Sequence, residues 1–437
     1  MKKECERTAD VRIDSGFGCG GQKERKKAQT EPQQLQKHQE PQEPLGIYLH
    51  IPFCVQKCAY CDFLSAPADE AIREQYVQAL CRQIETAGKR LKNRHADSVF
   101  LGGGTPTALS GGQLTRILSA VQQSFWLTPD AEITVECNPG TADPEKLSAL
   151  AKAGVNRLSI GLQSSKNEEL RLLGRIHTWE AFLQTYQWAK EAGIADRSID
   201  LISALPGQTA DSFREVLDDV QKLQPEHLSV YSLIVEAGTP FYNQYADGTG
   251  LPSEEEVLAI DRMVPEVLAQ AGYERYEISN YAKPGHASRH NLKYWSGGEY
   301  LGLGLGASSY LRTDCGLFAE TSFPIENGES ARYVRLRENS DLKQYLEKTV
   351  FCPEEIEALS MADEMEEYAF LGLRKCRGFS EAAFEARFGV GAEAVFHEPI
   401  RRYRALGLLK QENGRIFLTP EGLEVSNQIM ADFLLTD

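Results

Sequence analysis

The 437-residue sequence has no long apolar run and no excess of positive charge, and we expect no secretory leader. No apolar run reaches the roughly 18 residues that a membrane-spanning helix needs, so we expect no membrane segment. The net charge of −16 disfavours a nucleic-acid partner, because phosphate binding needs a basic face. Ten cysteines without a signal peptide indicate a reduced, cytoplasmic chain rather than a secreted disulfide scaffold.

Residues 1–45 have too few apolar side chains to form a core. They hold nine Lys or Arg, eight Asp or Glu, few aromatic residues and a Gln-, Glu- and Pro-rich stretch over 31–41. Such a segment cannot bury enough apolar area to fold, so we predict a disordered N-terminal extension. Its acidic residues also disfavour a mitochondrial transit peptide.

The chemistry of the chain starts from three cysteines in one short loop. Cys54, Cys58 and Cys61 have the spacing C-x3-C-x2-C, whereas an iron–sulfur cluster normally takes four cysteines. Three thiolates leave one iron open to a ligand that is not protein. The alternatives are inert core thiols or a zinc site with His50 as fourth ligand. Structural zinc usually takes two ligand pairs separated by a longer loop, and no second pair is nearby, so a [4Fe–4S] cluster is favoured.

From residue 46 onward, short apolar runs alternate with helical patterns, which is typical of parallel strands joined by helices. We therefore predict an α/β fold, a partial (β/α)6 barrel with its active residues at the C-terminal ends of the strands. The expected strands span 46–51, 98–101, 133–136, 157–160, 198–202 and 228–231, and the expected helices span 69–94, 112–124, 143–153, 179–192 and 212–222. The cysteine loop follows the first strand, so it should lie at the barrel mouth.

Polar or glycine-rich segments follow most of these strands. After the second strand comes a glycine run that ends in a threonine, and glycines allow backbone to approach a ligand closely. One such polar residue alone is more often a solvated loop residue or a helix cap. Their occurrence at successive strand ends predicts one shared binding site. The candidates are Gly103, Gly104, Thr105, Glu136, Gln163, Arg175 and Asp200.

The aromatic residue Tyr60 completes the pattern C-x3-C-x-aromatic-C, and the loop resembles that of the radical S-adenosylmethionine (SAM) superfamily. The resemblance implies that SAM chelates the open iron and that one electron from the cluster cleaves SAM into methionine and a 5′-deoxyadenosyl radical. The further motifs resemble those of the branch that contains the coproporphyrinogen dehydrogenases, and this resemblance covers about residues 46–435. It implies SAM contacts from Tyr48, Tyr60, Gly103, Gly104, Thr105, Glu136, Gln163, Arg175 and Asp200.

Two features decide the resemblance within that branch. The dehydrogenases carry an additional cysteine two residues after the third cluster ligand, where this sequence has Asp62-Phe63. The motif H-N-x-x-Y-W at 290–295 is similar to the signature of the HemW-type haem chaperones. The resemblance implies haem contacts from His290, Tyr294 and Trp295, since neutral imidazole is a common axial iron ligand. From the residues alone, a hydrogen-bonded core histidine and plain packing stay open.

The pattern of helices and strands in the last ~75 residues indicates a separate C-terminal module. We expect helices over 364–373, 380–388 and 393–406, then a hairpin of 408–410 with 415–418 that turns at Asn413-Gly414. This predicts a winged-helix-like module. Because residues 361–437 hold nine Lys or Arg against thirteen Asp or Glu, we expect a lid or docking domain rather than a DNA-binding one.

The predicted organisation follows from these segments. The extension covers 1–45, the radical SAM barrel 46–290, a completing and connecting segment 291–360, and a HemN-like C-terminal domain 361–437. The resemblance implies a haem chaperone that binds a [4Fe–4S] cluster, SAM and haem.

The expected partners are haem, a haem-acceptor protein and an electron donor such as flavodoxin or ferredoxin. Membrane contact is expected only peripherally, through the acceptor. Two alternatives stay open for the activity. One is an oxygen-independent coproporphyrinogen III dehydrogenase that performs oxidative decarboxylation. The other is a radical SAM methyltransferase or cyclase of the same branch, acting on an unrelated substrate.

Overall fold

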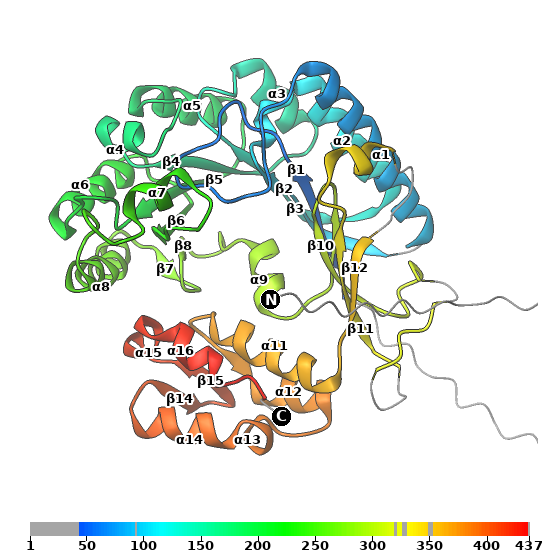
Figure 1. The fold of residues 1–437 in the computed structure, drawn as a ribbon, viewed down its shortest axis with the longest axis vertical. Helices are drawn as coiled ribbons and strands as arrows, with labels where there is room; N and C mark the ends of the chain where they lie inside the picture. Colours follow the sequence, from blue (N-terminus) through cyan, green and yellow to red (C-terminus); the bar gives the residue numbers. More distant parts are fainter. Residues whose placement is uncertain (1–42, 92–93, 319–320, 326–329, 348–352, 436–437) are drawn as a thin grey trace, which may run out of the picture. The chain divides into compact units, whose positions relative to one another are not determined.

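The computed structural model describes residues 43–91, 94–318, 321–325, 330–347 and 353–435 (Figure 1). Apart from its last three residues, the extension predicted over 1–45 lies outside these ranges. Within the described chain, no helix is both long enough and apolar enough to cross a bilayer.

Six parallel strands in sequence order form the centre of a twelve-stranded sheet. This confirms the predicted partial (β/α)6 barrel. The strands are β1 (Leu45–Ile51), β2 (His95–Gly103), β3 (Trp126–Cys137), β4 (Arg157–Gln163), β5 (Asp196–Ser203) and β6 (His227–Ser232). The connecting helices are α1 (Glu70–Arg90), α2 (Gly111–Ser124), α3 (Pro144–Lys152), α4 (Asn167–Leu172), α5 (Trp179–Glu191) and α6 (Ala210–Gln221).

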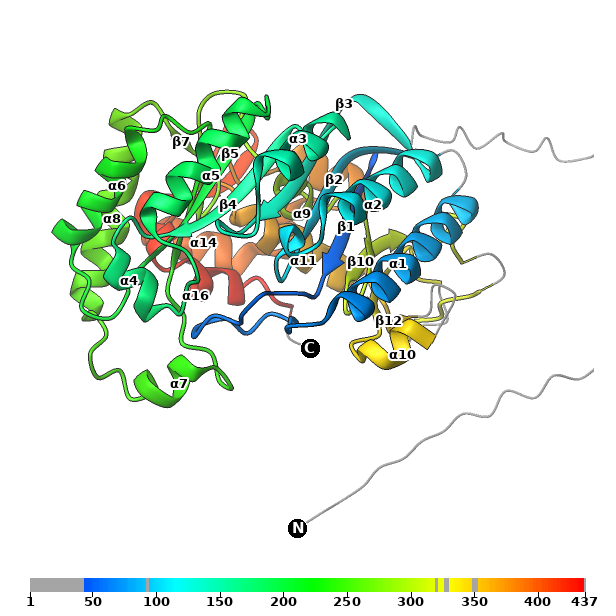
Figure 2. The same cartoon turned by 90° about the horizontal axis from the view of Figure 1, so that it is seen from above.

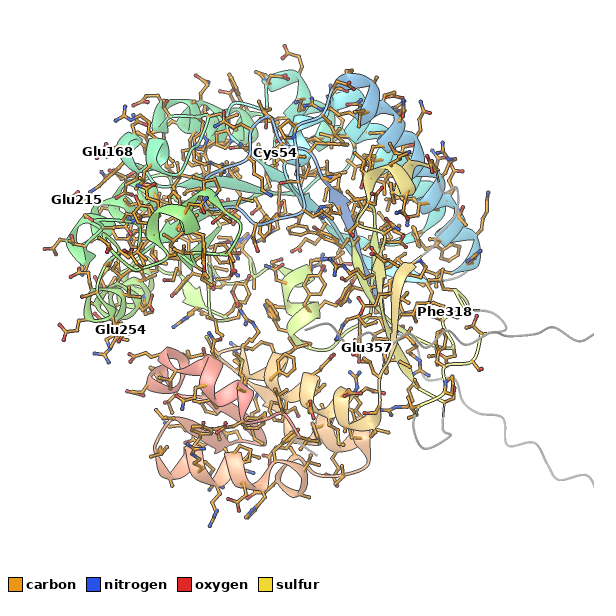
Figure 3. All side chains as sticks on the ribbon, in the orientation of Figure 1. Cys54, Glu168, Glu215, Glu254, Phe318 and Glu357 are labelled. Atoms are coloured by element: carbon orange, nitrogen blue, oxygen red, sulfur yellow. The ribbon has the colours of Figure 1, made fainter. Side chains whose placement is uncertain are left out.

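The helices lie along the outer side of these strands (Figures 1 and 2). After β6 the chain forms α7 (Pro240–Tyr245) and α8 (Glu254–Gln270). Figure 3 shows Glu168, Glu215 and Glu254 projecting outward from α4, α6 and α8. The outer helices thus carry part of the excess of acidic residues.

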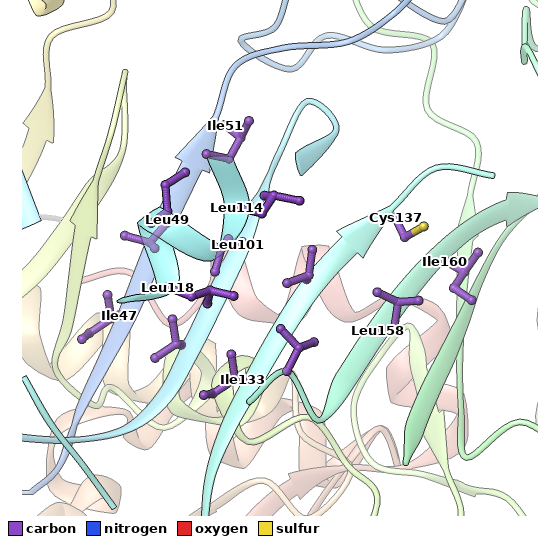
Figure 4. Packing of buried hydrophobic residues seen from close by; sticks show 14 of the residues in the cluster. Ile47, Leu49, Ile51, Leu101, Leu114, Leu118, Ile133, Cys137, Leu158 and Ile160 are labelled. Atoms are coloured by element: carbon purple, nitrogen blue, oxygen red, sulfur yellow. The ribbon is translucent and has the colours of Figure 1, made fainter. Parts of the chain in front are cut away.

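Each central strand alternates between two faces, as the two-residue period of a strand requires. The apolar positions of one face are buried beneath the helices and form the main hydrophobic core. Figure 4 shows this packing for Ile47, Leu49, Leu101, Ile133, Leu158 and Ile160 of the strands with Leu114 and Leu118 of α2. The intervening positions of β2 to β6 face the opposite way, and there many side chains are polar.

The sheet extends beyond the predicted strands at both edges. β9 (Tyr300–Leu303) pairs in parallel with β1, and β10 (Ser308–Arg312), β11 (Tyr333–Glu338) and β12 (Pro353–Ala358) add antiparallel strands beyond it. At the other edge lie β8 (Asn280–Ala282) and β7 (Glu274–Arg275). The sequence patterns did not predict these strands, because they are short and β9 lies in a glycine-rich run of low strand propensity.

The C-terminal segment has the order helix, strand, helices, hairpin and two short final helices, which confirms the winged-helix-like prediction; the two final helices were not predicted. Its three-stranded sheet has the order β13-β15-β14. Asn413 and Gly414 both have positive φ, as the predicted hairpin turn requires. The elements are α11 (Met361–Leu373), β13 (Phe379–Ser380), α12 (Glu381–Phe388), α13 (Ala392–Val395), α14 (His397–Ala405), β14 (Leu409–Glu412), β15 (Arg415–Leu418), α15 (Pro420–Glu424) and α16 (Ser426–Ala431).

The single helix predicted over 393–406 was wrong, since the structure has two helices there. Phe396 leaves the helical conformation, with φ −107° and ψ 35°. Pro399 then falls in the first turn of α14, where its missing N–H leaves no hydrogen bond unmade. One continuous helix would place Pro399 in the interior, where its ring collides with the carbonyl of residue 395.

Candidate functional site

A cavity of about 570 Å³ lies on the polar side of the central strands, within the size range of small-molecule sites. Its wall comes mainly from every second residue of β3 to β6, because alternate strand positions share one face. The strand residues in this wall are Phe100 and Gly103 of β2, with Thr134, Glu136, Cys137, Arg157, Ser159, Gly161, Gln163, Ser198, Asp200, Ile202, His227, Ser229, Tyr231 and Ser232 of β3 to β6.

The cysteine loop reaches this cavity from the end of β1, and Cys54, Cys58 and Cys61 all line it. Figure 3 labels Cys54 on this loop, inside the arc of outer helices. Backbone hydrogen bonds fix the loop at its base and at its tip. Cys54 N–H donates to the Ala66 carbonyl (3.2 Å), and Ala59 N–H donates to the Leu173 carbonyl (3.0 Å). The loop is therefore anchored at its first cysteine and again between its second and third cysteines.

The donor set fits a cluster better than a zinc ion. The three cysteines form no disulfide. Among the described residues, no three or more His, Cys, Asp or Glu side chains converge as they would around a single metal ion. His50, the alternative zinc ligand, uses both ring nitrogens, one with the Tyr48 hydroxyl and one with the Leu64 carbonyl (3.0 Å each). A four-iron cluster separates its thiolates more widely than one ion does, and three thiolates leave one iron open.

Two glycines at the end of β2 bring bare backbone to the cavity: Gly103 is the last residue of the strand, and Gly104 follows it. Gly103 has a φ of +114°, and a Cβ there would lie 2.5 Å from the ring of His50. At Gly104 a Cβ would lie 2.9 Å from the Phe53 carbonyl oxygen and 3.1 Å from Cys54 Sγ. Only glycine fits at these positions. The backbone edge that ends at Thr105 thus lies directly beside the cysteine loop.

Two carboxyl groups face each other across β3 to β5. Glu136 Oε2 accepts a hydrogen bond from Gly103 N–H (3.0 Å), and Asp200 accepts from the hydroxyls of Ser159 (2.8 Å) and Ser198 (3.3 Å). Burial and the neighbouring Asp200 raise the pKa of Glu136 to about 8. Glu136 is therefore largely protonated at neutral pH, so the pair offers both a donor and acceptors. Such a pair suits the hydroxyls of a ribose.

Arg175 is held with its guanidinium beside the cysteine loop. Nη2 donates to Asn138 Oδ1 (2.5 Å) and to the Gly161 carbonyl (2.6 Å), while Nη1 lies 3.5 Å from Cys58 Sγ. A fixed, charged fork of this kind suits a carboxylate. Its position next to Cys58 places that carboxylate near the three thiols.

Gln163 reaches the cavity through an irregularity that the sequence did not reveal. The register of β4 with β5 shifts between Gly161 and Gln163, and Gln163 has a φ of +77°. A non-glycine residue in this region is uncommon and costs conformational energy. Such strain at a cavity wall supports a binding role for Gln163.

The two predicted tyrosines occupy different places. Tyr60 lines the cavity. Tyr48 is not among the lining residues. It lies behind the wall, where its ring stacks on Phe100 with centroids 6.2 Å apart.

The predicted haem residues lie on α9 (Arg289–Trp295). His290 is 1% exposed, and its ring nitrogens bind Ser98 Oγ (2.9 Å) and the Tyr294 hydroxyl (2.8 Å). Burial lowers the pKa of His290 to about 3, so the ring is neutral. Axial ligation of iron would require one of these hydrogen bonds to break. Trp295 lies under the guanidinium of Arg374, 4.4 Å from its centre.

The structure thus brings the three cysteines and all residues predicted to contact SAM, except Tyr48, to one cavity. It does not bring the predicted haem residues His290, Tyr294 and Trp295 there. Sequence reasoning missed other wall residues. The signal for most of them was a polar residue at every second strand position. The missed residues include Thr134, Asn138, Arg157, Ser159, Ser198, His227, Ser229, Ser288 and Asn291.

Comparison with known proteins gives two family matches and several close relatives. Residues 48–220 match the radical SAM superfamily, and residues 359–425 match the HemN C-terminal domain. Proteins described as "Heme chaperone HemW" are similar along most of the chain. The one from Lactococcus lactis is 34% identical, covering 91% of this chain and 99% of its own. Those from Bacillus subtilis and Synechocystis are 33% and 37% identical, covering 89% of this chain and 99% and 96% of theirs.

Among solved structures, coproporphyrinogen III oxidase (HemN) from Escherichia coli, described as a radical SAM enzyme, is similar over 91% of both chains. The TM-score is 0.75 and the sequence identity is 25%.

Proposed function

Because the chain belongs to the HemW family of the radical SAM superfamily, we propose that it is a haem chaperone that binds a [4Fe–4S] cluster, SAM and haem and delivers haem to an acceptor protein. The observation that carries this proposal is that Cys54, Cys58 and Cys61 line the same cavity as the residues predicted to contact SAM, apart from Tyr48.

Each part of that cavity has a proposed role. The three thiolates hold the cluster, and Arg175 orients the SAM carboxylate next to the open iron. Glu136, Gln163 and Asp200 bind the ribose hydroxyls, and the strand edge Gly103–Gly104–Thr105 binds the SAM amino group through backbone atoms. When bound, the cluster supplies the electron that can cleave the SAM sulfonium.

Two features support a carrier over a coproporphyrinogen dehydrogenase. The additional cysteine of the dehydrogenases is absent, since Asp62-Phe63 follows the third cluster ligand. The relatives that share most of the chain's length are described as haem chaperones. We keep haem contact by His290, Tyr294 and Trp295 as part of the proposal. It requires α9 to rearrange, because His290 is hydrogen-bonded at both ring nitrogens.

The proposed setting is the cytoplasm, with an acceptor haem protein as the main partner. Flavodoxin or ferredoxin is proposed as the electron donor. Contact with a membrane would come through the acceptor, because no described helix could span a bilayer.

The decisive experiment is anaerobic purification followed by parallel haem-binding and coproporphyrinogen-decarboxylation assays. A carrier should bind about one haem per chain and should not form protoporphyrinogen from coproporphyrinogen III with SAM and an electron donor. Robust protoporphyrinogen formation would favour the dehydrogenase alternative. Absence of both activities would favour the third class, a radical SAM transferase or cyclase.

A further inference from the structure

Part of the cavity wall consists of polar residues that the proposed cluster and SAM contacts do not use. Thr134 and Arg157 are direct register partners on β3 and β4. Neighbouring strands contribute Ser198 and His227, and Ser288 and Asn291 come from the start of α9. We call these six residues the cavity floor; all of them line the cavity.

Helix α9 is fixed at this position by a carboxylate from β3. The Glu132 oxygens accept hydrogen bonds from the backbone N–H groups of Arg289 (3.0 Å) and His290 (3.1 Å). Lys293, one turn on, pairs with Asp97 of β2 at 3.0 Å. The Asn291 side chain is therefore presented to the cavity by a helix anchored on two strands.

Two buried groups of the cavity floor lack partners. Arg157 is 2% exposed; its Nη1 donates to the His286 carbonyl (2.9 Å), but its Nη2 has no hydrogen-bond partner in the described chain. The hydroxyl of Thr134, a fully buried residue, also has none among the described residues. Ser198 and His227, in contrast, bind each other at 2.7 Å. The buried hydrogen-bonding groups without a partner in the cavity floor therefore belong to the register pair Thr134 and Arg157.

A buried guanidinium nitrogen without a partner is costly, and an anionic oxygen would satisfy it best. The nearby acid, Asp200, is engaged by Ser159 and Ser198 and forms no ion pair with Arg157 in the described chain. A carboxylate would supply a direct ion-pair partner to Arg157 Nη2 and oxygens for the Thr134 hydroxyl and the Asn291 amide.

We infer that the cavity floor binds a carboxylate and that, under the proposed function on which this inference rests, this carboxylate is a propionate of the porphyrin. SAM also carries a carboxylate, but Arg175 is the arginine beside the cysteines. Arg175 contacts the Gly161 carbonyl, which lies four residues, or roughly 13 Å, along the β4 backbone from Arg157, and the Arg157 guanidinium is held by the His286 carbonyl instead. We therefore assign the carboxylate of SAM to Arg175 and a second carboxylate-bearing ligand to the cavity floor.

The test compares haem with its dimethyl ester in the full-length, cluster-loaded protein, by absorbance titration. The ester lacks both propionate charges. Arg157→Gln should lower the affinity for haem at least about tenfold, as expected for a lost charge-assisted contact, and should leave the affinity for the ester unchanged. Wild-type protein should prefer haem over the ester by a similar factor. Thr134→Val should cause a smaller loss for haem, and Arg157→Lys should recover part of the affinity.

The matched control is Arg197→Gln. Arg197 lies on the neighbouring strand β5 but pairs with Glu226 (2.7 Å) and does not line the cavity, so both affinities should stay unchanged. Cluster iron content and far-ultraviolet circular dichroism report folding. If Arg157→Gln fails to fold, Arg157→Lys and Thr134→Val decide the matter.

Several outcomes would overturn the inference. They are unchanged haem affinity in the variants, or equal losses for haem and the ester. A loss of SAM affinity in Arg157→Gln with haem unaffected would assign the cavity floor to the carboxylate of SAM instead. If wild-type protein binds haem and the ester equally, only the propionate assignment fails. If it binds neither, the proposed function fails as well.

Discussion

The hydroxyl of Tyr294 lies 2.8 Å from Nε2 of His290, one helical turn apart on α9. The other ring nitrogen of His290 binds Ser98 on β2, and the ring stacks on Phe100 with centroids 5.3 Å apart. The motif histidine therefore ties α9 to the second strand of the barrel. In this arrangement its contacts are those of a packed, hydrogen-bonded core residue.

Replacing His290 tests whether this packing or haem ligation dominates. His290→Ala should lower the free energy of unfolding by about 2–4 kcal/mol, because it leaves a cavity and two buried hydroxyls without a partner. Urea denaturation measures this, and iron content should show the cluster intact. A variant with native stability and no haem binding would instead show that His290 acts as a haem ligand.

The cluster assignment predicts a specific loss of iron. Anaerobically reconstituted protein should hold about four irons and four sulfides, and Cys58→Ala should abolish this content. Cys81→Ala is the matched control, since Cys81 lies on α1 and does not line the cavity, so this variant should leave the content unchanged. A full cluster in Cys58→Ala, or stoichiometric zinc in the wild type, would contradict the assignment.

SAM should perturb the electron paramagnetic resonance spectrum of the reduced cluster, because it is proposed to coordinate the open iron. Arg175→Ala and Asp200→Ala should each weaken SAM binding by about 1.5–3 kcal/mol, the value of a charge-assisted contact. Arg116→Ala removes an exposed arginine that pairs with Glu74 on the outer helices, so it should have no effect. Native SAM affinity in both cavity variants would show that SAM binds elsewhere.

Glu136 should make stability fall as pH rises through the neutral range. Its pKa is raised from 4.5 to about 8 by burial and by Asp200. Below pH 4.5 the group is protonated in both folded and unfolded protein. Between pH 4.5 and 8 only the folded protein retains the proton, so the free energy of unfolding decreases with pH and then levels off. In cluster-free, SAM-free protein, Glu136→Gln should flatten this decrease.

Urea denaturation at pH 5 and at pH 8 measures that slope. Glu74→Gln serves as the control, because hydrogen bonding from Arg116 lowers the pKa of Glu74 to about 2, outside this window. An equal slope in wild type and Glu136→Gln would mean that Glu136 ionises normally in the folded protein.

Arg387 is one of several arginines that hold the C-terminal domain to the sheet edge, together with Arg332 paired with Glu364 and Arg335 paired with Glu367. Arg387 of α12 donates to the Tyr310 hydroxyl (2.8 Å) and the Gly297 carbonyl (3.0 Å), and its guanidinium lies 4.8 Å from the ring centre of Tyr333 on β11. Arg387→Ala should therefore lower stability by about 2–4 kcal/mol and speed limited proteolysis between barrel and domain. Arg401→Ala removes an exposed arginine of α14 and should change neither measure.

Much of the barrel could be predicted from the sequence, because its strands and helices are marked by patterns among residues that are near one another in the chain. The two-residue period of the strands and the helical pattern between them marked β1 to β6, and in a parallel barrel this order places every strand end at one mouth. The cysteine spacing and the polar residues at those ends then indicated one shared cavity. The turn at Asn413-Gly414 was predicted for the same reason, since the two residues can both take positive φ.

Features that depend on distant partners could not be predicted in this way. The pairing of β9 with β1 joins segments about 250 residues apart, and Gln163 enters the cavity through a register shift. The role of His290 changes with its neighbours: the motif suggested a haem ligand, whereas its contacts with Ser98 and Tyr294 are made only in the fold. The sequence by itself determined which chemistry the strand ends offer, because spacing and alternation are properties of the chain. Only the tertiary structure decided which groups are left without partners, as at Arg157, because hydrogen bonding and burial depend on residues far apart in sequence.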